Sequence, residues 1–96
     1  MYRVALEFQV QASALVLRTG AVVRNQLRRA SLSCVLNVAE GAGQRLWAQK
    51  RNLYGIARGS AMECAAIIDV LSVRGVATPA ETGRGRALLV RMVSSC

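Results

Sequence analysis

The stretch that decides the fold runs from residue 26 to residue 42 and reads QLRRASLSCVLNVAEGA. Apolar side chains recur in it at steps of three and four residues, which is the spacing of one face of an α-helix. The members of this face are Leu27, Ala30, Cys34, Val38 and Ala42. Because neither glycine nor proline interrupts residues 21–40, we predict one long helix from Ala21 to about Ala42.

A polar row follows the same helix at heptad-like steps, which place its members on one stripe. The row consists of Gln26, Arg29, Ser33, Asn37 and Glu40. Ser60 and Glu63, further along the chain, have the spacing to meet this row. Two interpretations stay open: a groove for a ligand or RNA, or a polar network inside the bundle or between subunits. The network is the interpretation that we favour.

The next helix is predicted from about residue 46 to residue 73, where Arg74-Gly75 ends it. Its apolar row comprises Leu53, Ile56, Ala57, Ser60, Ala61, Cys64, Ile67, Ile68 and Leu71. Gly55 and Gly59 lie four residues apart, which lets another backbone approach closely. We expect that approach inside the bundle and not at a functional site.

Residues 2–18 are ambiguous at their start, because apolar and polar residues alternate there as in a β-strand. A helical row is also present and consists of Val4, Phe8, Ala12, Leu15 and Val16. The Ala and Leu content downstream and the lack of a partner strand favour a helix. Thr19-Gly20 then ends it.

The C-terminal segment opens with a capping box. Its members are Thr78 as N-cap, Pro79 at the first helical position and Glu81 as the partner of the cap. Gly83 and Gly85 each cost about 1 kcal/mol in a helix interior. We therefore predict that the helix that follows, from Arg86 to about Val93, is short and frays unless a neighbour holds it.

Four helices with short connections pack most simply as an antiparallel up-down-up-down four-helix bundle. A chain of 96 residues is long enough for one hydrophobic core, so we expect a single all-α domain over residues 1–96. Hydrophobic residues make up 53% of the chain before its eight glycines are counted. Apolar residues and glycine together make up about 45–50% of an ordinary soluble domain. We therefore expect part of this surface to be covered by further copies of the chain.

No membrane segment is expected, because the charge-free stretches are short. The stretch from Phe8 to Leu17 is half of the roughly 20 apolar residues that a spanning helix needs. Glu7 also interrupts the place where the apolar part of a secretory leader would begin. Three widely spaced cysteines, Cys34, Cys64 and Cys96, suit a reducing cytoplasm better than a disulfide framework. A cytoplasmic protein is the expectation.

The formal net charge is +8, from thirteen basic and five acidic residues. Such a surplus attracts phosphates or acidic proteins. The candidate nucleic-acid-binding residues are Arg24, Arg28, Arg45, Lys50, Arg51 and Arg58. Trp47 lies among them and could stack on a base. The alternative is a charged outer surface that only keeps an apolar bundle soluble.

An enzyme needs a base, a nucleophile or a metal placed beside a partner. The chain has no histidine, and its five acids are scattered. Without histidine or a pair of close cysteines, a zinc site is not expected either. The sequence therefore predicts no catalytic residues, no metal and no cofactor.

Three segments together resemble the bacterial four-helix bundle proteins. They are Gln26–Ala30 (QLRRA), Ser33–Gly41 (SCVLNVAEG) and Ile56–Glu63 (IARGSAME). That family was first noticed as open reading frames within intervening sequences of large-subunit ribosomal RNA genes. It includes the accessory variability determinant proteins of diversity-generating retroelements. The resemblance covers about Gln26 to Leu71, and Cys34 and Val35 depart from the family pattern.

This resemblance implies antiparallel four-helix protomers that assemble into a homopentamer without enzymatic activity. In the retroelement branch it implies a basic surface that binds a reverse transcriptase and its RNA. It also assigns a structural role to the signature residues Gln26, Arg29, Ser33, Asn37, Glu40, Gly59, Ser60 and Glu63. The expected function is thus an oligomeric scaffold for nucleic acid or a nucleic-acid enzyme. The alternative is a structural or protein-interaction assembly without a nucleic-acid partner.

Overall fold

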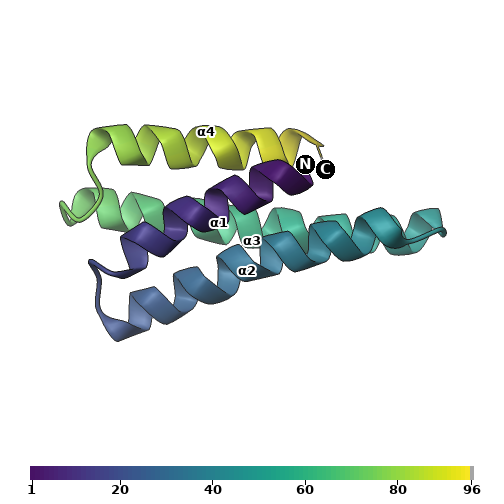
Figure 1. Ribbon diagram of the computed structural model, residues 1–96, viewed down its shortest axis with the longest axis horizontal. Helices are drawn as coiled ribbons and strands as arrows, with labels where there is room; N and C mark the ends of the chain where they lie inside the picture. The colour runs from purple at the N-terminus through teal and green to yellow at the C-terminus, as the bar shows by residue number, and fades with distance from the viewer. Residues whose placement is uncertain (96) are drawn as a thin grey trace.

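The computed structural model describes residues 1–95, and this part of the chain is all helical, without a strand. Its helices are α1 (Tyr2–Val16), α2 (Ala21–Gly43), α3 (Trp47–Val73) and α4 (Pro79–Ser95). Successive helices run in opposite directions, as Figure 1 shows. The expected four-helix arrangement is therefore confirmed, whereas Cys96 lies outside the described residues.

Each helix packs against its neighbours in the sequence, and α1 also packs against α4, so that the four helices form a closed ring. The most extensive contact is the one between α2 and α3. The largest side chains of the core are fully buried and include Phe8, Leu15, Leu27, Ile68, Leu71 and Met92. Within residues 1–95, no helix combines the length and the apolar character needed to cross a membrane.

Helix α1 resolves the ambiguity between strand and helix in favour of the helix. All members of the predicted helical row are buried, and Phe8 and Leu15 are at 0% exposure. The apolar residues of the alternating pattern do not share one face, as a strand would require: Tyr2 and Val10 are exposed, whereas Val4 is buried. Packing at the helical period therefore decides the structure of this segment.

The prediction of a short C-terminal helix is wrong, since α4 is continuous from Pro79 to Ser95. The capping box at its start is confirmed. The Glu81 backbone N–H donates to Thr78 Oγ1 at 3.1 Å, and the Thr78 N–H donates to Glu81 Oε1 at 2.9 Å.

Gly85 explains why glycine is tolerated within α4. A Cβ at this position would lie 2.7 Å from Ile68 Cδ1 and 3.2 Å from Gln11 Oε1. The missing side chain thus allows α4 to pack closely against α3 and α1. Tertiary packing offsets the low helix propensity of glycine, which is a local property of the chain.

Three details of the predicted rows on α2 and α3 are corrected. Ala42 is exposed, and its neighbour Gly41 is the buried residue of that turn. Ile56 is 45% exposed, because it lies on the outer side of α3. Gly55 and Gly59 are exposed too, and apart from the adjoining backbone and chain neighbours no described atom lies within 4 Å of a Cβ built on either. The expected close packing of these two glycines inside the bundle is therefore wrong.

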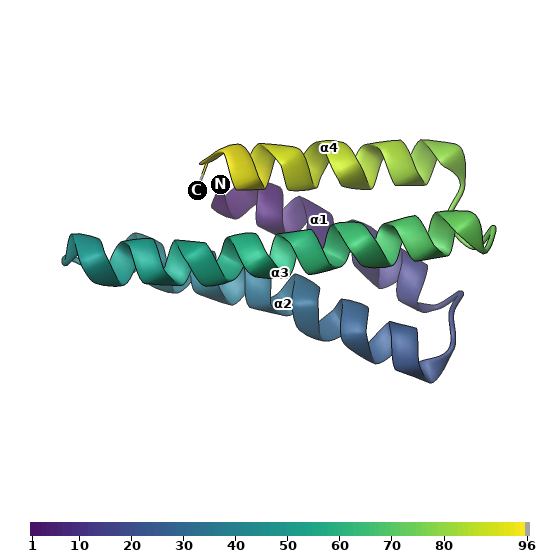
Figure 2. The same cartoon turned by 180° about the vertical axis from the view of Figure 1, so that it is seen from behind.

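The helices differ in length, and this difference shapes the molecule. Helices α2 and α3 contain 23 and 27 residues, whereas α1 and α4 contain 15 and 17. The connection between α2 and α3 therefore projects beyond the end of the bundle where both chain termini lie, as Figures 1 and 2 show. We call this projection, residues 40–58, the hairpin tip.

Candidate nucleic-acid interface

The six basic residues singled out in the sequence fall into two groups. Arg24 and Arg28 lie near the start of α2, at the end of the bundle opposite the hairpin tip. The tip carries the other four, Arg45, Lys50, Arg51 and Arg58. At about 1.5 Å per residue, Arg45 lies roughly 25 Å from Arg28 along the bundle. Arg58 lies closer to Arg28, because Ser60 is opposite Ser33 of α2.

Ion pairs divide the arginines into two classes. Arg18 pairs with Glu81, Arg29 pairs with Glu63, and Arg86 pairs with Asp69. Within residues 1–95, none of the six candidate residues belongs to an ion pair. Three of the five acids thus neutralise other arginines, and the candidate residues keep their charge.

The ion pair between Arg18 and Glu81 contains two hydrogen bonds and lowers the pKa of the carboxyl group. Arg18 donates to it through both terminal nitrogens, one of them at 2.8 Å from Oε1. This hydrogen bond, together with the one from the Thr78 backbone, lowers the pKa of Glu81 to about 2. The pair ties the end of α1 to the start of α4, and it leaves Arg18 unsuited to phosphate binding.

The polar row of α2 meets α3 along the seam between the two helices. The hydroxyl groups of Ser33 and Ser60 lie 2.8 Å apart. Asn37 Nδ2 donates to the Ser33 carbonyl oxygen at 2.9 Å and lies 3.0 Å from Ser33 Oγ. These three side chains are half-buried, so they form a network at the edge of the core.

The ends of this row are more exposed. Arg29 donates to Gln26 Oε1 at 2.6 Å, and its guanidinium lies 3.7 Å from the carboxylate of Glu63. Glu40, at the other end, borders a hollow of the hairpin tip. The structure thus forms two separate sets of contacts across the seam, one of Gln26, Arg29 and Glu63 and one of Ser33, Asn37 and Ser60. Glu40 and Gly59 are exposed outside both sets.

Two cysteine thiols are buried in the core. Cys34 on α2 and Cys64 on α3 are both at 0% exposure, and both are free. A hydrogen bond with Cys34 and burial raise the pKa of the Cys64 thiol above its usual range. A protonated, buried thiol is unreactive, so Cys64 acts as a core residue, and Cys34 is buried in the core to the same extent.

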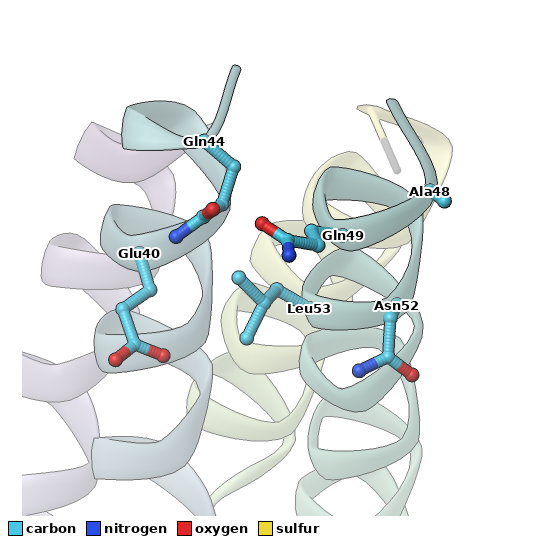
Figure 3. A pocket seen from close by; sticks show the side chains of 6 residues that line it. All are labelled: Glu40, Gln44, Ala48, Gln49, Asn52 and Leu53. Carbon is cyan, nitrogen blue, oxygen red and sulfur yellow. The ribbon is translucent and has the colours of Figure 1, made fainter. Parts of the chain in front are cut away.

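A shallow hollow of about 480 Å³ opens between α2 and α3 at the hairpin tip. It is lined by Glu40, Gln44, Ala48, Gln49, Asn52 and Leu53. Figure 3 shows the side chain of Gln49 extending from α3 toward Gln44 at the end of α2. Sequence reasoning missed these amides, although their density around the connection at residues 44–46 was a visible signal.

Tyr54 is a second tip residue that sequence reasoning missed. Its ring lies against Gly41, where a Cβ would come within 2.5 Å of Tyr54 Cε1. Trp47, in contrast, is 70% exposed at the start of α3. The tip therefore combines an aromatic side chain that packs between α2 and α3, Tyr54, with one that is exposed to solvent, Trp47.

Comparison with known proteins adds one finding. The family model described as 23S rRNA-intervening sequence protein matches residues 2–94, almost the whole chain. Among curated proteins, none matches the chain.

Proposed function

The chain belongs to the family of 23S rRNA-intervening sequence proteins, and from this premise we propose that it is a non-enzymatic, self-assembling scaffold that binds nucleic acid. The family resemblance expected from the sequence is thereby confirmed. The family description refers to ribosomal RNA, which is compatible with a role related to nucleic acid.

One observation carries the nucleic-acid part of the proposal. Ten of the thirteen basic residues, the six candidates among them, have no ion-pair partner within residues 1–95, while three of the five acids are held by other arginines. An arginine or lysine that is not neutralised can replace the counterions of a phosphate, which favours binding at low salt. The guanidinium group also binds phosphate oxygens in a bidentate manner.

Exposed apolar side chains support the self-assembly. They are spread over all four helices, and Leu17, Val22, Met62, Val73 and Val90 are each more than 60% exposed. Water-exposed side chains of this size favour contact with another protein surface. The homopentamer implied by the family resemblance is the assembly that we expect. A reverse transcriptase is the protein partner that the same resemblance implies.

The proposal assigns no catalytic step to the chain. Its sequence contains no histidine. Within residues 1–95, no three His, Cys, Asp or Glu side chains gather to hold a metal ion. We place the scaffold in the cytoplasm on the argument from the widely spaced cysteines.

The decisive experiment measures the binding of a labelled RNA oligonucleotide at about 50 mM and about 200 mM salt. We expect affinity to fall steeply over this range for a protein that makes several phosphate contacts. The triple variant Arg24→Ala, Arg28→Ala and Arg51→Ala should bind much more weakly, while light scattering shows an unchanged assembly. The matched control replaces Arg3, Arg74 and Arg91, three exposed arginines that lie elsewhere.

Two results would overturn the proposal: RNA binding that is absent at low salt, or binding that the triple variant retains in full. The first result would favour the alternative, an assembly that contacts only proteins, and the second would show that these three arginines do not hold the RNA. A specific feature supports this alternative. A hollow of about 250 Å³ between α3 and α4 is mainly apolar and includes Met62, Leu89, Val90 and Val93.

A further inference from the structure

Four side chains at the hairpin tip alternate between aromatic and basic along one face of α3. Trp47, Arg51, Tyr54 and Arg58 follow one another at steps of four, three and four residues. This spacing places them in one row along the helix. At about 1.5 Å per residue, the row is roughly 16 Å long. We call it the tip row.

The tip row is open to solvent because α4 ends before reaching it. The hollow between α3 and α4 has Ser94, near the end of α4, and Ala61 in its lining. The α3 residues before Arg58 therefore lie beyond the end of α4, as the projecting hairpin in Figure 2 shows. Trp47 is 70% exposed, and Arg51 and Arg58 are exposed.

The two aromatic residues differ in how they are held. Tyr54 is half-buried, because its ring packs on Gly41, and this contact fixes the face of α3 that carries the row. Trp47 has most of its surface exposed to water. An exposed indole presents a flat apolar surface that can stack on another flat ring.

The charge around the tip row is mainly positive, and the one acid of the hairpin tip, Glu40, borders the hollow beside Gln44 and Asn52. From Gly41 to Met62 the chain contains no acidic residue, and it contains Arg45, Lys50, Arg51 and Arg58. A polyanion with flat apolar rings complements this surface in both respects. The backbone of a single-stranded nucleic acid supplies the charge, and its unpaired bases supply the rings.

We infer that the tip row binds single-stranded nucleic acid, with an unpaired base stacked on Trp47 and the adjacent phosphates on Arg51 and Arg58. This inference rests on the proposed function and names its partner: an unpaired strand. In a duplex, the faces of the bases are covered by their neighbours, so Trp47 has no surface on which to stack.

The test uses the fluorescence of Trp47, which is the only tryptophan of the chain. The full chain is titrated at low salt with a single-stranded oligonucleotide, as RNA and as DNA, and with a duplex of equal phosphate content. We expect the single strand to quench the emission and the duplex to leave it unchanged. The variant Trp47→Leu should bind the single strand about tenfold more weakly, given the usual strength of base stacking on aromatic residues.

Matched variants separate the contributions of the ring and of the charges. Tyr2→Leu removes an aromatic side chain of α1 that is 48% exposed, and it should leave the affinity unchanged. Arg51→Gln with Arg58→Gln should weaken binding and reduce its salt dependence, whereas Arg74→Gln, at the other end of α3, should do neither. Because these side chains are exposed, the variants should fold normally.

The outcomes distinguish this inference from the proposed function. Equal affinity for single strand and duplex, without quenching and without an effect of Trp47→Leu, would overturn the inference and leave the proposed function intact. Failure of every oligonucleotide to bind at low salt would overturn both. Quenching by the single strand alone, together with the loss in Trp47→Leu, would establish the tip row as the binding surface.

Discussion

The ring of Tyr54 occupies the space that a side chain on Gly41 would need. A Cβ at Gly41 would lie 2.5 Å from Tyr54 Cε1 and 2.7 Å from Cδ1. This contact joins α2 to α3 at the base of the hairpin tip, beyond the part of the bundle that α1 and α4 cover. Gly41 is therefore conformationally ordinary but needed for packing, because any side chain at this position would collide with Tyr54.

From this contact we predict that Gly41→Ala destabilises the protein by about 1–3 kcal/mol, the usual cost of overpacking. Urea denaturation monitored by circular dichroism would measure the change. Gly43→Ala is the matched control, because no described atom lies within 4 Å of its Cβ position. In a Tyr54→Ala background, the cost of Gly41→Ala should largely disappear, and a cost that persisted would contradict the packing argument.

Two glycines of α4 allow a second comparison. Gly85→Ala should destabilise the protein, because its Cβ would lie 2.7 Å from Ile68 Cδ1. Gly83→Ala, on the exposed side of the same helix, should stabilise it by about 0.5–1 kcal/mol through helix propensity. Thermal unfolding of both variants checks the prediction. If the two substitutions shifted the midpoint in the same direction, close packing at Gly85 would not be the reason for the glycine.

These glycines show where sequence reasoning succeeds and where it ends. The period of the apolar residues predicted the four helices, and the capping box at Thr78 predicted the start of α4. Helix propensity is a local quantity, however, and it cannot show that Ile68 fills the space beside Gly85. The same limit applies to Gly55 and Gly59, whose spacing suggested internal packing although both lie on the surface.

The candidate site was predictable in its residue types but not in its arrangement. The basic residues and Trp47 were recognisable from the sequence. The ion pairs that remove Arg18, Arg29 and Arg86 from the free charges join residues far apart in the sequence or on different helices, so they required the structure. The exposure of the tip row likewise depends on where α4 ends. The sequence of α3, which carries the row, contains no information on that position.

The pair of Arg18 and Glu81 predicts a specific dependence of stability on pH. The pKa of Glu81 is about 2 in the folded protein, below its ordinary value of 4.5. Ionised Glu81 therefore stabilises the fold above pH 4.5, and this contribution is lost as the pH falls through about 2. We expect Glu81→Gln to be less stable than the parent protein at pH 6 and to lose less stability on acidification.

The measurement is the thermal midpoint at pH 6 and pH 2 at constant ionic strength. Glu7→Gln, which removes an exposed carboxylate of α1 without an ion pair in the described part of the chain, is the control and should keep the parent protein's response. A Glu81→Gln variant that lost as much stability on acidification as the parent protein would show that the ion pair contributes little in solution.

The hydroxyl pair of Ser33 and Ser60 provides a test between the two interpretations of the polar row. Ser33 interacts with both Ser60 and Asn37, whereas Ser60 has only the contact with Ser33 among the hydrogen bonds described for its side chain. Ser33→Ala should therefore cost more stability than Ser60→Ala, each within about 0.5–1.5 kcal/mol. The two substitutions together should cost less than the sum of the single ones, because they remove one shared hydrogen bond.

Nucleic-acid affinity measured on the same variants completes the test. A structural network predicts that Ser33→Ala and Ser60→Ala change the urea midpoint while RNA affinity stays the same. A binding groove predicts the reverse pattern, a loss of affinity with little change in stability. The half-buried position of both hydroxyl groups favours the network. Additive stability effects in the double variant, with weakened RNA binding, would assign the row to the ligand instead.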